Sequence, residues 1–145
     1  MYTNSMNIFL LNTSLTVFAI VGFVCCGLFY EQSIDAKKRH LDTHLVCNDR
    51  SCSLLLETKY YHIFYVPNWW YGIVFYSIVL ITALSANPLV ALLAIMGAVS
   101  SSCVSIFLIW ALFFKLKTVC NVCYTAHTAN ALILITLIAR YLISR

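Results

Sequence analysis

Two pairs of cysteines stand at spacings that suit thiol chemistry. Cys47 and Cys52 are separated by four residues, and Cys120 and Cys123 form a Cys-Asn-Val-Cys motif. Such a motif at the start of a helix favours the thiolate, because the helix N-terminus is electropositive and two lysines stand just before it. The thiolate is the species that attacks disulfides, so the second pair is predicted to be a redox motif.

Other interpretations of the cysteines remain open. Four thiols can bind one zinc ion tetrahedrally, and either pair can form a purely structural disulfide. Cys25, Cys26 and Cys103 fall inside apolar segments, where cysteine behaves as a small hydrophobic residue. The alternative to an oxidoreductase is therefore a non-enzymatic membrane scaffold or an interaction protein stapled by a four-cysteine zinc site. The redox interpretation needs no metal.

Composition places these cysteines in a membrane protein. Of the 145 residues, 62% are hydrophobic and 10% are charged, whereas soluble domains usually carry about 25% charged residues. The first apolar run has 23 uncharged residues, about 34 Å as a helix, enough to cross a hydrocarbon core of about 30 Å. We predict an all-α integral membrane protein, a single domain over residues 1–145 whose four transmembrane helices cover residues 8–30, 69–84, 88–114 and 118–139.

One extramembrane loop, residues 31–67, is predicted between the first two helices. It holds all five acidic residues and five of the nine lysines and arginines. The segment from Ser85 to Pro88 is a turn signal, in which the proline can open the next helix. Because each span reverses the side of the membrane, the loop and the junction before Cys120 must share one face. All four paired thiols can therefore meet.

The order of these motifs resembles that of the vitamin K epoxide reductase family. The segment from Trp110 to Cys123 is similar to the sequence that leads into that family's redox motif, and Cys47 with Cys52-Ser53 resembles its loop cysteines. The motif opens the last helix here, whereas the bacterial quinone reductase DsbB carries its motif in the first loop. The resemblance spans nearly the whole chain.

The resemblance implies that electrons pass between the two cysteine pairs. Cys123 would face a quinone, and Cys120 would be its disulfide partner. Cys52 would exchange with Cys120, while Cys47 would be opened by a thioredoxin-like or DsbA-like protein. The implied substrate is a quinone of the vitamin K, menaquinone or ubiquinone type, or vitamin K epoxide. Disulfide formation driven by quinone and vitamin K recycling driven by thiols are the two possible directions.

Five further residues are candidates for the substrate pocket. By resemblance, Asn68 donates a hydrogen bond to a quinone oxygen, and His127 stands where animal members place a tyrosine. Phe64, Tyr71 and Phe75 match aromatic residues that line the family's pocket. Each also has a structural interpretation: Asn68 as a helix N-cap, His127 as a group bonded to a backbone carbonyl, and the aromatics as packing or interfacial residues.

The distribution of basic residues along the sequence bears on the protein's binding partners and on its orientation in the membrane. The basic residues are scattered among the acids, so no nucleic-acid partner is predicted; the predicted partners are lipid, quinone and the redox protein. Seven of the nine lysines and arginines lie on the cysteine face, which the positive-inside rule alone would put in the cytoplasm. Disulfides are rare there, and the resemblance implies an extracytoplasmic face, lumenal or periplasmic, which we adopt.

Overall fold

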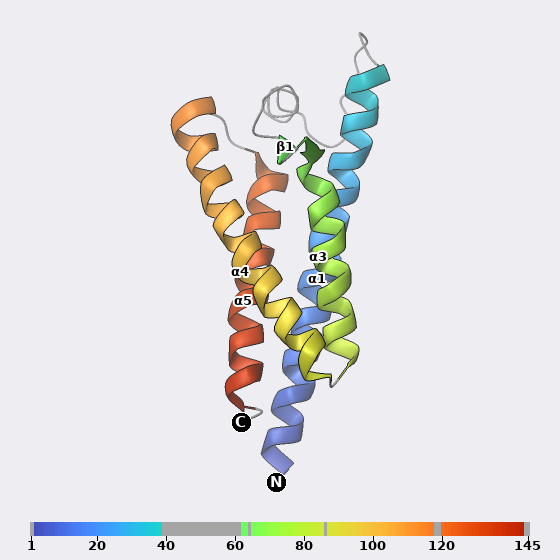
Figure 1. Ribbon diagram of the computed structural model, residues 1–145, viewed down its shortest axis with the longest axis vertical. Coiled ribbons are helices and arrows are strands. Elements are labelled where there is room, and N and C mark those ends of the chain that lie inside the picture. The colour runs from blue at the N-terminus through green and yellow to red at the C-terminus, as the bar shows by residue number, and fades with distance from the viewer. Residues whose placement is uncertain (1, 39–61, 64, 86, 118–119, 144–145) are drawn as a thin grey trace.

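The computed structural model describes residues 2–38, 62–63, 65–85, 87–117 and 120–143. Long helices dominate it, together with a short antiparallel hairpin (Figure 1). The elements are α1 (Tyr2–Lys38), β1 (His62–Ile63), β2 (Val66–Pro67), α3 (Asn68–Leu84), α4 (Pro88–Trp110), the π-helical segment η2 (Ala111–Leu116) and α5 (Asn121–Ile143).

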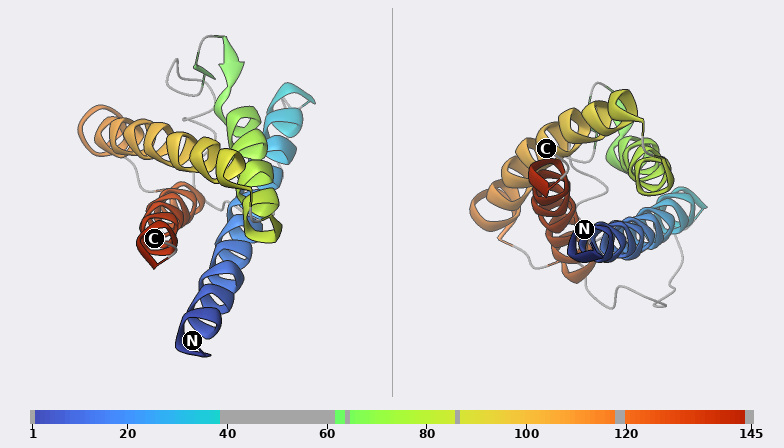
Figure 2. Two further views of the ribbon diagram at one scale, coloured as in Figure 1. Left: turned by 60° about the horizontal axis from the view of Figure 1, so that its bottom comes forward. Right: turned by 90° about the horizontal axis from the view of Figure 1, so that it is seen from below.

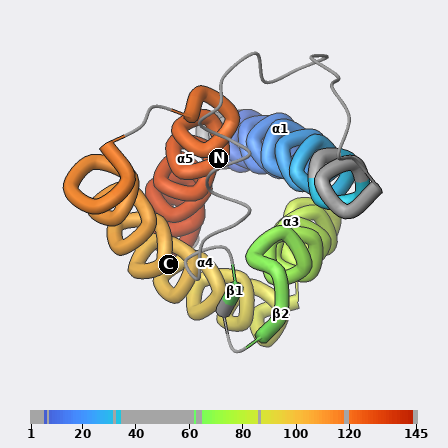
Figure 3. The backbone as a smooth tube through the Cα atoms, turned by 90° about the horizontal axis from the view of Figure 1, so that it is seen from above, coloured from blue at the N-terminus to red at the C-terminus, as the bar shows by residue number. Residues whose placement is uncertain are grey.

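The four long helices stand in a ring. α1 packs against α3 and α5, and α4 packs against the same two helices. The view from above shows the resulting order α1, α3, α4, α5 around the bundle (Figure 3). The chain termini and the turn between α3 and α4 lie at one end, and the hairpin and the start of α5 at the other (Figure 1). Figure 2 shows the termini at the near end when the bundle is seen from below.

The helices are those of an integral membrane protein. Among the described residues, three stretches are long and apolar enough to cross a membrane: Ile8–Glu31, Pro88–Leu116 and Asn121–Ile143. α3 has 17 residues, about 26 Å as a helix against a hydrocarbon core of about 30 Å. The all-α membrane class is confirmed.

A buried cluster from all four helices fills the centre of the bundle. It includes Leu15 of α1, Val79 of α3, Ala98 of α4 and Ile133 of α5. Small residues bring the helices close together, as transmembrane interfaces generally require. A methyl group added at Gly22 of α1 would overlap the ring of Tyr76 on α3, so only glycine fits there.

The turn between α3 and α4 forms as predicted. Asn87 accepts a hydrogen bond on its side-chain oxygen from the backbone N–H of Leu89, at 2.9 Å. Pro88 follows as the first residue of α4, where its missing N–H is harmless. A capping side chain and a proline therefore start the helix together.

The two ends of the segment predicted as a loop, residues 31–67, have regular secondary structure instead. α1 continues to Lys38, although its membrane-compatible part, Ile8–Glu31, agrees with the predicted span over residues 8–30. Charged residues mark where the membrane ends, and a helix can continue beyond that point into water. At the other end of the predicted loop, His62–Ile63 and Val66–Pro67 pair as the two strands of the hairpin. Toward the C-terminus, the helical segments end at Leu116 and Ile143, later than the predicted residues 114 and 139.

Candidate redox site and its cavity

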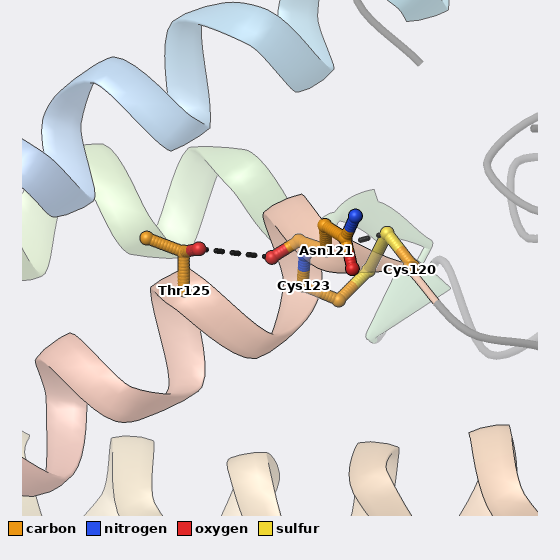
Figure 4. Close-up of a disulfide and its surroundings, with 4 residues drawn as sticks. All are labelled: Cys120, Asn121, Cys123 and Thr125. Carbon is orange, nitrogen blue, oxygen red and sulfur yellow. Dashed lines mark hydrogen bonds between the residues drawn. A yellow bond between two sulfur atoms is a disulfide. The ribbon is translucent and has the colours of Figure 1, made fainter. Parts of the chain in front are cut away.

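A disulfide joins Cys120 and Cys123 at the start of α5 (Figure 4). Their Cα atoms are 5.2 Å apart, and both residues are buried, with 1% and 4% of their surface exposed. The carbonyl of Cys120 accepts the first helical hydrogen bond, from Tyr124 at 3.0 Å. Cys120 therefore stands at the N-cap and Cys123 in the first turn. The motif opens the helix as predicted, although α5 begins at Asn121 and not at residue 118.

The helix N-terminus acts directly on the sulfur of Cys120. The backbone N–H of Cys123 donates to Cys120 Sγ at 3.3 Å (Figure 4). This N–H is one of the first four of the helix, which have no partner within it. A donor in this place stabilises negative charge on the sulfur when the disulfide opens. The expected help from Lys115 is not seen, because its ammonium lies over the Trp110 ring, 5.9 Å from the centroid.

The backbone before the motif ends α4 in two steps. α4 widens into the π-helical segment η2, and Lys117 then adopts a left-handed conformation with φ 48°. Its N–H bonds to the carbonyl of Leu112. A left-handed residue at a helix end stops the helix, so the chain can turn back toward α5.

A cavity of about 650 Å³ lies next to the disulfide. Its wall is mostly apolar and comes from all four long helices and from Val66 of β2. Cys123 lines this cavity, whereas Cys120 is not among its lining residues. Cys25 and Cys26, which lie on α1 as predicted and are buried, also line the cavity. One sulfur of the disulfide thus belongs to a residue on an apolar cavity wall.

Four of the candidate pocket residues line the cavity: Asn68, Tyr71, Phe75 and His127. Phe75 is buried against the Tyr76 ring, with 5.2 Å between ring centroids. Cys47, Cys52 and Phe64 lie outside the described residues.

Two of the structural interpretations are wrong. Pro67, not Asn68, occupies the N-cap of α3, and no side chain caps that helix. His127 does not bond a backbone carbonyl through Nδ1, because this nitrogen lies 2.9 Å from the hydroxyl of Ser105. Neither the N-cap nor the backbone carbonyl therefore accounts for the positions of Asn68 and His127 at the cavity.

Three polar residues at the cavity were missed from the sequence: Tyr76, Ser105 and Asn130. They form a hydrogen-bonded chain that reaches His127. A signal for them existed, because hydroxyl and amide side chains within apolar spans usually bond across helices. Their separation in the sequence hid which of them meet.

Among the described residues, no three His, Cys, Asp or Glu side chains are grouped to hold a metal ion. A four-cysteine zinc site would require free thiolates at both members of the last pair. Here Cys120 and Cys123 are bonded to each other.

The sequence was also compared with models of known protein families. Residues 13–138 match the model described as the Vitamin K epoxide reductase family, whose members are membrane thiol–disulfide oxidoreductases linked to quinones. The match runs from the first membrane-compatible helix to the last and includes the disulfide, the cavity and the candidate pocket residues. A buried disulfide beside an apolar cavity in a membrane bundle is the arrangement that such chemistry needs, and this chain belongs to the vitamin K epoxide reductase family.

Proposed function

We propose that the protein is a membrane enzyme that transfers two electrons between a thioredoxin-like or DsbA-like protein and a quinone. The observation that carries this proposal is the position of Cys123, which belongs to a buried disulfide and lines an apolar cavity. The cavity volume of about 650 Å³ falls in the range of about 300 to 1,000 Å³ that small-molecule sites occupy. A quinone ring suits such a wall because it is flat and largely apolar.

The chemistry at the disulfide is a balanced two-electron exchange. When the thiols of Cys120 and Cys123 close to a disulfide, they release two electrons and two protons, and the quinone takes up both to become a quinol. The thiolate of Cys123 attacks or donates into the ring, and Cys120 then closes on it. The N–H that points at Cys120 Sγ favours the thiolate form of that residue.

Asn68 and His127 are the proposed hydrogen-bond donors to the substrate. Negative charge develops on a quinone oxygen as electrons arrive, and a fixed donor in a dry site stabilises that charge. Both residues line the same cavity as Cys123. Phe75 and Tyr71, with Phe64, are proposed to hold the ring by packing. The substrate is a quinone of the vitamin K, menaquinone or ubiquinone type, or vitamin K epoxide.

The loop cysteines are proposed to reset the site. Cys52 exchanges with Cys120, and Cys47 then exchanges with the redox partner. This relay requires α3 to span the membrane with the other helices, so that the loop and the motif share one face. Its support is that α3 runs the length of the bundle between the hairpin end and the end with the termini (Figure 1). We propose that the hairpin end faces the extracytoplasmic side.

The proposal is tested with purified protein in detergent. The protein is reduced with a dithiol, freed of excess reductant and mixed with a soluble quinone, and quinone reduction is followed by absorbance. We expect one quinone reduced per Cys120–Cys123 pair in a single turnover, and continuous turnover when a reduced thioredoxin-like protein is added. Cys103→Ser is the matched control, because this thiol is exposed on α4 and lies outside the cavity wall.

A different outcome would support the non-enzymatic alternative. A reduced protein that leaves the quinone untouched and carries one zinc ion per chain would favour the zinc-stapled scaffold. Protein-bound zinc is measured on the same sample by atomic absorption.

A further inference from the structure

A chain of partly buried side-chain hydrogen bonds crosses the bundle beside the cavity. The Tyr76 hydroxyl of α3 donates to Asn130 Oδ1 of α5 at 2.7 Å. The Asn130 amide donates through Nδ2 to Ser105 Oγ of α4 at 3.0 Å. The same Ser105 oxygen lies 2.9 Å from Nδ1 of His127. All four residues line the cavity.

The chain is placed where unpaired polar groups are most costly. Tyr76 and Ser105 are buried, with 2% and 5% of their surface exposed. In the apolar interior of a membrane bundle, a buried donor or acceptor that lacks a partner is costly, so hydrogen bonds within the protein are strongly favoured. α3 and α5 are not neighbours in the ring, and the bond from Tyr76 to Asn130 therefore joins helices across the bundle interior.

The direction of the bonds determines which nitrogen of His127 carries the proton. The phenol gives its only proton to Asn130, and the Asn130 amide gives one of its protons to Ser105. The Ser105 hydroxyl then has one proton left to donate, and within the described part of the chain its only other hydrogen-bond partner is Nδ1 of His127. Nδ1 is therefore an acceptor, and the proton of the imidazole sits on Nε2.

A charged imidazolium would break this pattern, since Nδ1 would then need an acceptor. The described residues that line the cavity include no aspartate or glutamate that could pair with it. Burial of an unpaired charge in such a wall is strongly unfavourable. The direction of the hydrogen bonds and the residues that line the cavity thus both indicate a neutral imidazole with its proton on Nε2.

We propose that Tyr76, Asn130 and Ser105 are positioning residues that hold His127 as the Nε2–H tautomer, so that it presents a fixed N–H donor to an oxygen of the substrate. This inference rests on the proposed function for its purpose, although the tautomer itself does not depend on activity. A ring held at Nδ1 can neither rotate freely nor exchange its proton between the two nitrogens. The donor is then in place before charge develops on the substrate, which is the condition for effective stabilisation.

The test is nitrogen NMR on full-length protein in detergent with ¹⁵N-labelled histidine rings. The chain has four histidines, and loss of one signal set in His127→Gln identifies the signals of interest. We expect the wild-type protein to show a protonated Nε2 and an unprotonated Nδ1 at His127. A protonated Nδ1 would overturn the inference, because it would mean that the amide is turned over and every bond in the chain is reversed.

Variants then test whether the hydrogen bonds of Tyr76, Asn130 and Ser105 determine the tautomer of His127. Ser105→Ala should give a mixture of tautomers and lower kcat per folded molecule by about tenfold to hundredfold, by analogy with the loss of the hydrogen-bond partner of a metal-bound histidine. Ser105→Thr keeps the hydroxyl and should restore the wild-type spectrum. Tyr76→Phe, which removes the first donor, should also shift the tautomer. An unchanged His127 spectrum in Ser105→Ala would overturn the inference.

A matched control lies one helical turn away. The hydroxyl oxygen of Ser102 on α4 is buried and has no hydrogen-bond partner among the described residues, and Ser102 is not part of the cavity wall. Ser102→Ala should leave both the spectrum and kcat unchanged, and a shift there equal to that of Ser105→Ala would count against the specific role of Ser105. Wild-type protein that never reduces a quinone but shows the expected tautomer would instead refute the proposed function alone.

Discussion

The guanidinium of Arg140 on α5 donates a hydrogen bond of 2.7 Å to the carbonyl of Thr82 and a second, of 3.1 Å, to the carbonyl of Ser85. These carbonyls lie at the end of α3, where a helix has no partners of its own for its last acceptors. A cation at this end also opposes the negative pole of the helix. Arg140 thus ties α3 to α5 at the end of the bundle opposite to the disulfide.

Removal of this contact should destabilise the bundle without changing the chemistry. Arg140→Leu leaves two carbonyls without their donor, and we expect the free energy of unfolding to fall by about 2 kcal/mol. Arg140→Lys should lose part of that, because an ammonium cannot reproduce the two-pronged geometry. Thermal unfolding in detergent measures both, and quinone reduction per folded molecule should stay near the wild-type value. An unchanged melting temperature in Arg140→Leu would contradict the capping role.

Gly22 offers a sharper test of the packing around the cavity. A methyl group at this position would meet the Tyr76 ring, whose hydroxyl is held in place by Asn130. We therefore expect Gly22→Ala to destabilise the protein by about 1 to 3 kcal/mol through overpacking. Gly27→Ala is the matched control on the same helix, because nothing lies within 4 Å of the added atom. It should be neutral or slightly stabilising, since alanine favours a helix.

The sequence predicted those features that depend on neighbours along the chain. Apolar runs placed the membrane helices, Asn87 and Pro88 placed the turn, and the Cys120 to Cys123 spacing placed a redox motif at a helix start. Each of these signals lies within one short segment. The extension of α1 to Lys38 was missed, because hydropathy reports the membrane boundary and not the end of the helix.

The polar chain beside the cavity could not be found in this way. Tyr76 and Asn130 are 54 residues apart, and Ser105 and Asn130 are 25 apart. Polar side chains of this kind occur at many positions in the spans, and only the packing of α3, α4 and α5 selects these three. The family resemblance pointed to His127 but said nothing of the residues behind it.

The two cysteine pairs should have different roles, which substitutions can distinguish. Cys120→Ser or Cys123→Ser should abolish quinone reduction with every reductant, because this pair is proposed to exchange electrons with the substrate. Cys47→Ser should remain active when a small membrane-permeant dithiol replaces the protein partner. Quinone absorbance is followed for each variant with both reductants. Equal loss of activity in all three variants with the small dithiol would contradict the proposed division of labour.

Sidedness is accessible to chemical labelling. If the loop and the motif share the hairpin end, a membrane-impermeant thiol reagent should reach reduced Cys47, Cys52 and the Cys120–Cys123 pair from one side only. Sealed membrane vesicles of known orientation are labelled before and after permeabilisation, and modified cysteines are identified by mass spectrometry. Labelling of the two pairs from opposite sides would rule out the relay. Labelling of both from the cytoplasmic side would keep the relay and correct only the compartment.

Asn68 separates a substrate contact from a structural role. It is the first residue of α3, it lines the cavity, and the N-cap position belongs to Pro67. Asn68→Ala should therefore change the free energy of unfolding little. If the amide stabilises charge on a quinone oxygen, the same variant should slow turnover by about 10² to 10³, the usual loss for one such donor.

Asn68→Asp makes the distinction stricter, because the two roles predict opposite effects. A carboxylate in the first turn of a helix interacts favourably with the helix dipole, by about 0.3 to 1 kcal/mol, so the variant should fold as well as the wild type. The ionised group has no proton to donate, and it repels the negative charge that develops on the substrate. We expect a melting temperature at or slightly above that of the wild type together with severely reduced kcat, measured by thermal unfolding and by quinone absorbance on the same preparation. Turnover like that of the wild type in a fully folded Asn68→Asp protein would show that the amide does not contact the substrate, and the donor role would then fall to His127 alone.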